Sequence, residues 1–220
     1  MKLISEKREA LLFSHVIAVT NRRLCSRPLT EQVEKICRLH PQALLLREKD
    51  LSESEYNLLA QDILNICKRY EVPCILHTYL QTAEQLNCPF IHLPFPVFME
   101  CNGKSDHLIL ESPENPYGSF REISGKTGQF LRAGTSVHSV DEAVKAQQAG
   151  ALWLIAGHIY ATDCKKGLPP RGTDFLRAVC QAVSIPVYAI GGIRPEETQL
   201  QEVMDCGAAG GCIMSGMMKL

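Results

Sequence analysis

The sequence predicts a single α/β domain, a (β/α)₈ TIM barrel over residues 1–220, and three observations point to it. The length suffices for one barrel and falls short of two ordinary domains. Eight short apolar runs rich in β-branched residues recur along the chain. Helical patterns lie between these runs. An alternation of eight buried strands with helices favours a closed parallel barrel over an open sheet.

The predicted strands share a continuous hydrophobicity that is typical of strands buried on both faces of a parallel sheet. They span residues 15–20, 43–48, 73–77, 90–94, 131–137, 152–157, 186–192 and 210–216. Residues 1–12 are expected to form a polar lead-in to the first strand.

Four helices are predicted from residues that favour helix ends. Thr30, Ser52 and Ser139 each have a hydroxyl that can accept a free N–H at a helix start. Glu142, three residues after Ser139, is expected to complete a capping box. Pro195 stands at the start of the fourth helical pattern. The four patterns span residues 30–40, 52–70, 139–148 and 195–207.

Two features depart from an ideal barrel. Residues 97–129 form a polar stretch rich in Gly, Pro, Ser and Asn, which predicts an irregular insertion. Only a few residues follow the eighth predicted strand, so the final outer helix is expected to be missing or truncated. We expect this to leave an apolar flank between the first and last strands, and hence a homodimer.

Composition excludes several classes of protein. The chain has 23 Lys and Arg against 24 Asp and Glu, and nucleic-acid binding requires a basic field that this balance does not supply. The apolar run 10–20 is far shorter than the ~20 residues of a membrane span. None of the ten cysteines has CxxC spacing, which favours reduced thiols in a cytoplasmic protein over a zinc site.

Small residues follow the last two predicted strands. Gly191 and Gly192 come after the seventh strand, and Ser215 and Gly216 after the eighth. Active-site groups of barrels gather at the carboxyl ends of the strands, where these two loops recurrently bind phosphate. Residues without large side chains let backbone N–H groups approach an anion closely. The pattern therefore predicts a phosphate site.

Other strand ends supply cations and a base. Arg47 and Lys49 follow the second strand, Lys165 lies in the loop 158–172, and Ser136 ends the fifth strand. These four are candidate ligands for substrate anions, whereas Lys166 is expected to be exposed.

His138 is the candidate acid–base residue, because a histidine at a strand end can exchange protons near neutral pH. His77, His92 and His158 hold similar strand-end positions and are weaker candidates.

Residues 134–172, GTSVHSVDEAVKAQQAGALWLIAGHIYATDCKKGLPPRG, carry a resemblance to a known group of proteins. With IPVYAIGGI and GGCIMSG further on, they resemble the thiamine phosphate synthase and TenI superfamily. The segments SVHS and TDCKKGL resemble the TenI branch in particular, whose characterised activity is thiazole tautomerase.

The resemblance separates the two branches residue by residue. The synthase branch joins two phosphorylated substrates with magnesium and has a Q-x-R-x-K segment at strand two. Here Arg47 and Lys49 are retained, but Leu45 replaces the glutamine. Thr78 and Val97 stand where the synthase has magnesium-binding aspartates. Because magnesium prefers such oxygen ligands, we expect no metal and no cofactor.

The resemblance therefore implies a tautomerase that aromatises a carboxylated thiazole phosphate by proton transfer. His138 matches the acid–base histidine of SVHS. Two alternatives stay open: a thiamine phosphate synthase with displaced metal ligands, and a non-catalytic TenI-like protein that binds or senses a phosphorylated ligand.

Overall fold

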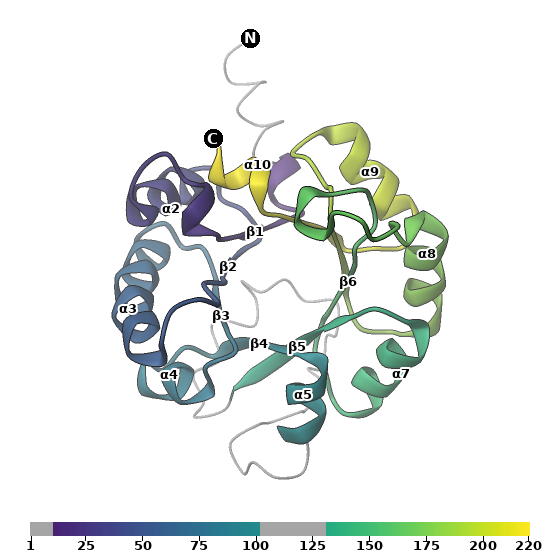
Figure 1. The fold of residues 1–220 in the computed structure, drawn as a ribbon, viewed down its shortest axis with the longest axis horizontal. Coiled ribbons are helices and arrows are strands. Elements are labelled where there is room, and N and C mark those ends of the chain that lie inside the picture. Colours follow the sequence, from purple (N-terminus) through teal and green to yellow (C-terminus); the bar gives the residue numbers. More distant parts are fainter. Residues whose placement is uncertain (1–10, 102–130) are drawn as a thin grey trace.

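The computed structural model describes residues 11–101 and 131–220, which form a closed barrel of eight parallel strands in sequence order. Figure 1 shows the strands as an inner ring with helices around them. The predicted fold class is therefore confirmed. Residues 1–10 of the predicted lead-in and residues 102–129 of the predicted insertion lie outside the described residues.

Each of the eight predicted apolar runs contains one strand. The strands are β1 (Val16–Val19), β2 (Ala43–Leu46), β3 (Cys74–His77), β4 (Phe90–Pro94), β5 (Arg132–Val137), β6 (Leu154–Gly157), β7 (Val187–Ile190) and β8 (Gly210–Ile213).

Helices follow the strands on the outside of the barrel. They are η1 (Arg22–Leu24), α2 (Leu29–Cys37), α3 (Glu53–Arg69), α4 (Leu80–Gln85), α5 (Phe95–Cys101), α7 (Val140–Gln148), η2 (Asp163–Lys165), α8 (Gly172–Ala182), α9 (Glu197–Asp205) and α10 (Ser215–Met218).

Of the three hydroxyl residues that the sequence predicts to cap helices, Ser52 and Ser139 do so and Thr30 does not. Ser52 caps α3 in a full capping box with Glu55. The prediction for Thr30 is wrong, because α2 begins at Leu29 and Thr30 lies in its first turn. Ser139 caps α7 by accepting the Glu142 N–H at 3.0 Å. The Glu142 carboxylate does not accept the Ser139 backbone N–H, so the predicted capping box is only half formed.

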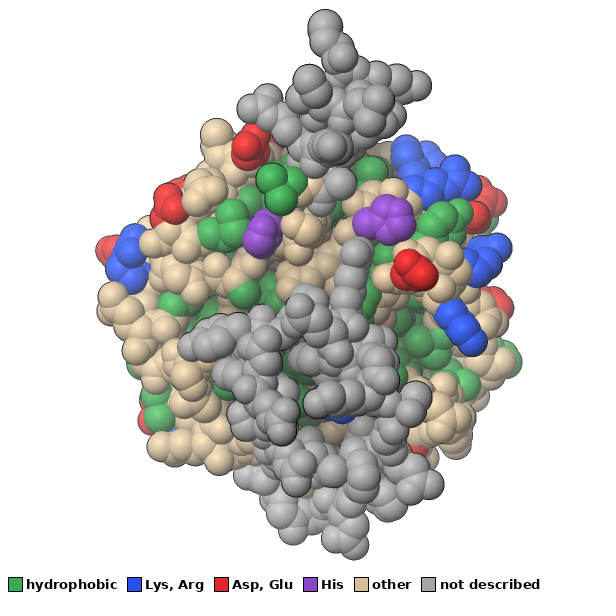
Figure 2. Space-filling model, turned by 180° about the vertical axis from the view of Figure 1, so that it is seen from behind, with side chains coloured by type: hydrophobic (Ala, Val, Ile, Leu, Met, Phe, Trp, Pro, Cys, Tyr) green, Lys and Arg blue, Asp and Glu red, His purple; other side chains and the backbone are tan. Residues whose placement is uncertain are grey.

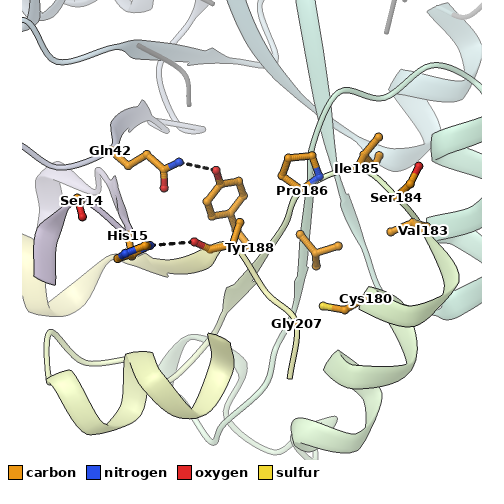
Figure 3. A pocket seen from close by; sticks show the side chains of 12 residues that line it. Ser14, His15, Gln42, Cys180, Val183, Ser184, Ile185, Pro186, Tyr188 and Gly207 are labelled. Carbon is orange, nitrogen blue, oxygen red and sulfur yellow. Dashed lines mark hydrogen bonds between the residues drawn. The ribbon is translucent and has the colours of Figure 1, made fainter. Parts of the chain in front are cut away.

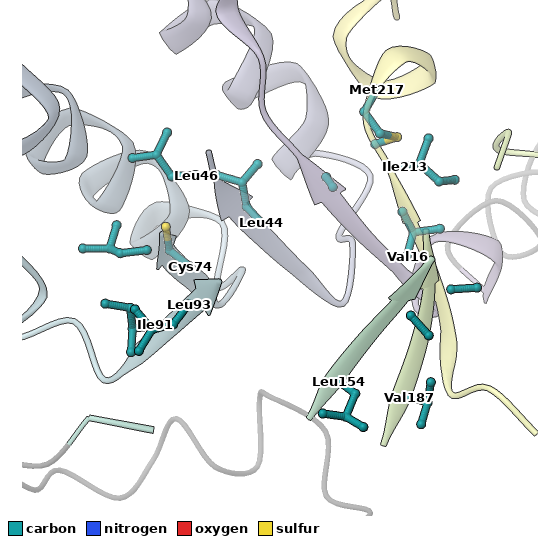
Figure 4. Close-up of a cluster of buried hydrophobic side chains, with 14 of the residues drawn as sticks. Val16, Leu44, Leu46, Cys74, Ile91, Leu93, Leu154, Val187, Ile213 and Met217 are labelled. Carbon is teal, nitrogen blue, oxygen red and sulfur yellow. The ribbon is translucent and has the colours of Figure 1, made fainter. Parts of the chain in front are cut away.

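The core divides into two layers because strand side chains alternate between the two faces of the sheet. Val16, Leu44 and Ile91 belong to the cluster between strands and helices, part of which Figure 4 shows. Leu45 and Trp153 belong to the cluster inside the barrel. A side chain at the carboxyl end of a strand therefore points into the barrel mouth or outward according to its position in this alternation.

The last strand is followed by the single helical turn α10, so the final helix is short rather than missing. Met217 is 0% exposed and packs in the same cluster as Val16 and Ile213 (Figure 4). The Gln32 amide also donates to the Met217 carbonyl at 2.6 Å. At these residues, the flank that the sequence predicts to be uncovered is buried. The exposed flank was the argument for a homodimer, so the homodimer stays a prediction without it.

The structure agrees with the interpretation of the cysteines, since all ten are free thiols. No helix among residues 11–101 and 131–220 is long and apolar enough to cross a membrane. Figure 2 shows acidic and basic side chains interspersed at the edge of the face opposite to that of Figure 1.

Gly134 of β5 gives a test of the packing inside the barrel. A Cβ atom at this position would lie 2.1 Å from the ring of Trp153. We expect Gly134→Ala to lower the free energy of unfolding by about 1–3 kcal/mol, because overpacking displaces a buried ring. Urea denaturation measures the loss. In a Trp153→Leu background the same substitution should cost less, and equal losses in both backgrounds would contradict this packing.

Candidate active site

The carboxyl ends of β3, β4 and β5 bring three polar side chains together at the mouth of the barrel. His77 and His92 are partners in the β3–β4 register, so both point the same way. Their ring centroids lie 5.9 Å apart. His92 Nε2 is 2.8 Å from the Ser136 hydroxyl, and His77 Nδ1 is 2.5 Å from the Thr78 hydroxyl. Ser136, predicted as an anion ligand, thus also contacts a buried histidine.

Both of these histidines are neutral near pH 7. Burial lowers the pKa of His77 to about 2, helped by His92, Lys49 and Arg47. Burial lowers the pKa of His92 to about 3, helped by the charges of Lys49 and Arg47. A histidine whose pKa is this low stays in its neutral form at neutral pH, with a proton on one ring nitrogen only. His77 and His92 therefore supply neutral hydrogen-bonding groups to the floor of the site.

Three cations that the sequence singles out as candidate anion ligands, Arg47, Lys49 and Lys165, lie near one another. Burial lowers the pKa of Arg47. Burial, followed by the charges of Arg47 and Lys165, lowers the pKa of Lys49. No carboxylate in the part of the chain that the structure describes forms an ion pair with these three side chains. We call Arg47, Lys49 and Lys165 the cation cluster, and its uncompensated charge suits an anionic ligand.

Glu48, between two members of the cation cluster, has a structural task. Its side chain is buried and accepts the Arg22 backbone N–H at 3.0 and 3.1 Å. The Arg22 guanidinium donates to it at 3.1 Å and also to Asp50. These bonds attach η1 to the end of β2. The Glu48 carboxylate is therefore engaged by Arg22 and forms no ion pair with the cation cluster within the described residues, although its charge partly opposes the lowering of the Arg47 pKa.

His138 stands directly after β5 with its ring oriented by the next strand. Its Nδ1 lies 2.8 Å from the backbone carbonyl of Gly157, the last residue of β6. A carbonyl oxygen accepts and cannot donate, so Nδ1 carries the proton of the neutral ring. The lone pair then resides on Nε2. This places an available base on an exposed side chain at the mouth of the barrel.

The two loops predicted to hold phosphate lie side by side. A Cβ atom at Gly216 would be 2.9 Å from Pro195 Cδ, in the loop after β7. Within the described residues, the N–H groups of Gly191, Gly192, Ser215 and Gly216 donate to no acceptor. Free N–H donors in two adjacent loops are suited to bind an anion.

Gly192 also has a packing role. It adopts a φ of +70°, and a Cβ atom there would lie 2.6 Å from the Ala161 carbonyl oxygen. Any larger residue would displace the β6–α8 loop that carries Lys165. Substitution of Gly192 would therefore disturb this loop as well as the anion site.

A cavity of about 450 Å³ lies at the opposite end of the barrel (Figure 3). In it the Gln42 amide donates to the Tyr188 hydroxyl at 2.7 Å, and His15 Nδ1 lies 3.3 Å from the Ala209 carbonyl. No residue predicted from the sequence as part of the site lines this cavity.

The chain is similar to known proteins in both sequence and fold. A family model described as "Thiamine monophosphate synthase" matches residues 16–95 and 114–217. The thiamine-phosphate synthase of Clostridium botulinum strain Hall is 32% identical over 203 residues, covering 91% of this chain and 88% of that protein. That of Clostridium acetobutylicum is 28% identical over 201 residues, covering 91% and 85%.

The fold is also found among solved structures. Thiamine phosphate pyrophosphorylase from Pyrococcus furiosus superposes with a TM-score of 0.69 at 24% identity, covering 94% of this chain and 89% of that chain. The N-acetylmannosamine-6-phosphate 2-epimerase of Clostridium perfringens has a TM-score of 0.56 at 14% identity, covering 96% and 90%. These two likenesses show the fold.

The buried histidines predict how stability depends on pH. The pKa of His92 is depressed on folding, so between about pH 6.5 and 3 the unfolded chain binds a proton that the folded chain does not. Stability should fall as the pH falls through this range. In His92→Gln, the loss between pH 7 and 5 should be smaller by about 2 kcal/mol, measured by urea denaturation.

Ser136→Ala is the matched control, because it removes the same hydrogen bond and keeps the titrating ring. This variant should retain the wild-type dependence on pH. An unchanged pH dependence in His92→Gln would show that folding does not lower the pKa of His92.

Proposed function

The chain belongs to the thiamine monophosphate synthase family of thiamine biosynthesis enzymes, TMP-TENI, and we propose that its own reaction is a tautomerisation. The proposed substrate is a carboxylated thiazole phosphate, which the enzyme aromatises by moving a proton between two carbons. The single observation that carries the proposal is His138, held by the Gly157 carbonyl with Nε2 free. The resemblance of SVHS and TDCKKGL to the TenI branch selects the substrate class.

In the proposed mechanism, His138 is both base and acid. Its Nε2 accepts the proton that leaves a carbon of the thiazole, and the electron pair delocalises into the conjugated ring and its carboxylate. The imidazolium that forms keeps its Nδ1–H on the Gly157 carbonyl, and this bond strengthens when the donor is charged. His138 then returns the proton to the second carbon, so the reaction involves no net redox change.

The rest of the site would hold the two anionic groups of this substrate. The free N–H groups after β7 and β8 suit the phosphate. The cation cluster suits an anionic group at the same mouth, because its members form no ion pair with a carboxylate among the described residues. We assign the cation cluster exclusively to neither the carboxylate nor the phosphate. Anchoring at two points would position the reacting carbon against His138.

The magnesium that the synthase branch implies does not fit the residues present here. At the two positions where the resemblance places aspartates, Thr78 hydrogen-bonds to His77 and Val97 lies in α5. No group of three or more His, Cys, Asp or Glu side chains in the described part of the chain could hold a metal ion. We therefore derive no step through magnesium.

Thiamine phosphate synthase is the second candidate, and a specific observation favours it. The relatives at 28–32% identity that cover 91% of this chain carry that name. A synthase would join a pyrimidine pyrophosphate to a thiazole phosphate with loss of pyrophosphate, and Arg47 and Lys49 are retained from its strand-two segment.

One assay separates the two candidates. The purified protein is given the carboxylated thiazole phosphate with EDTA, and aromatisation is followed by ultraviolet absorbance. In parallel it is given both synthase substrates with magnesium, and release of pyrophosphate is measured. The proposal predicts turnover in the first reaction and none in the second. Magnesium-dependent joining of the two synthase substrates, without any tautomerisation of the thiazole, would show that the protein is a synthase instead.

Replacement of His138 tests the mechanism. His138→Ala should lower the turnover number by about 10²–10⁴-fold, the usual contribution of general acid–base catalysis. The affinity for the phosphorylated ligand should change only a few-fold, because the anion sites lie elsewhere. His138→Gln should fail similarly, since an amide keeps a hydrogen bond without carrying the proton.

His40→Asn is the control for this experiment. It removes a histidine at the opposite end of the barrel, and Asn tolerates its φ of +50°. Turnover close to wild type in a folded His138→Ala enzyme would exclude His138 as the proton carrier.

A further inference from the structure

We propose that Glu142 is a positioning residue for His138: its carboxylate holds the histidine main chain so that the ring stays between the Gly157 carbonyl and the substrate. This inference rests on the proposed function. The observation behind it is a hydrogen bond of 2.6 Å from the His138 backbone N–H to Glu142 Oε2.

Glu142 reaches His138 because α7 begins immediately after it. The helix spans Val140–Gln148, and Glu142 lies in its first turn. Ser139 accepts the Glu142 N–H at 3.0 Å. The two bonds run in opposite directions across the same five residues, so the segment 138–142 is fixed at both ends.

His138 is thus held at two independent points. Its ring donates to β6 through the Gly157 carbonyl, and its backbone donates to α7 through Glu142. On the preceding side Val137 is 0% exposed within the core, which fixes the end of β5. Loss of the Glu142 bond would free rotation about the His138 backbone, and Nε2 would spend less time aimed into the mouth.

The hydrogen-bond partner of Glu142 indicates a role beyond capping the helix. In a capping box, the glutamate accepts from the backbone N–H of the cap residue, here Ser139. Here the Glu142 carboxylate accepts instead from the backbone N–H of His138, one residue before the cap. Hydrogen bonds to a charged acceptor are shorter and stronger than neutral ones, which suits a restraint on a catalytic group.

The experiment compares Glu142→Ala, Glu142→Gln and the control Asp141→Ala. Asp141 lies on the same helical turn, carries the same charge and pairs with Lys145 rather than with His138. We expect Glu142→Ala to lower kcat of the tautomerisation about tenfold with KM within twofold, as expected when a restraint on the reacting geometry is lost. Glu142→Gln should recover most of this loss, because its amide oxygen still accepts the N–H. Asp141→Ala should match wild type.

Equal losses of kcat in Glu142→Ala and Asp141→Ala would assign the effect to helix charge and overturn the proposal. Equal losses in Glu142→Ala and Glu142→Gln would overturn it too, because the amide keeps the acceptor. Urea denaturation of each variant confirms that the proteins compared are folded. If Glu142→Ala does not fold, Glu142→Val, which also lacks the acceptor, takes its place in the same comparison.

Nitrogen NMR of the labelled protein without substrate gives a readout that does not depend on activity. Wild type should show the His138 ring with its proton on Nδ1, and Glu142→Ala should show a mixture of tautomers. An unchanged ring signal in Glu142→Ala would overturn the positioning role. A wild-type enzyme without tautomerase activity would instead refute the proposed function and leave this measurement valid.

Discussion

Closure of eight parallel strands is the constraint on which the site depends. In a closed parallel barrel every strand ends at the same rim, so residues distant in sequence become neighbours there. His138 after β5 meets the carbonyl of Gly157 because β5 and β6 are neighbouring parallel strands of this ring. The loops after β7 and β8 touch for the same reason. An open sheet of the same strands would not bring the first and last of them together.

The polar side chains at the mouth of the barrel differ in charge and exposure, and therefore in what they can do. Burial beside cations keeps His77 and His92 neutral, whereas His138 stands exposed at the mouth with an oriented lone pair. The cation cluster has no ion pair with a carboxylate among the described residues, and Glu48, between two of its members, is hydrogen-bonded to Arg22 instead. A substrate with two anionic groups and a weakly acidic carbon would match this division.

Much of the fold could be predicted from the sequence, because continuous apolar runs report burial on both faces of a parallel sheet. The rim positions of His138 and Gly192 followed from strand ends alone. The His92–Ser136 bond and the Gly157 carbonyl could not be derived from strand ends, although inward alternation along β4 and β5 was a usable signal. The burial of Met217 was missed because a one-turn helix has too short a pattern to recognise.

A crystal structure of the protein with a carboxylated thiazole phosphate bound would test the central claim most directly. The account predicts the phosphate against the N–H groups after β7 and β8 and a reacting carbon within about 3.5 Å of His138 Nε2, the reach of a near-attack geometry. Either of two results would contradict it: a thiazole bound with its reacting carbons away from His138 Nε2, or a His138 ring that makes no hydrogen bond to the Gly157 carbonyl.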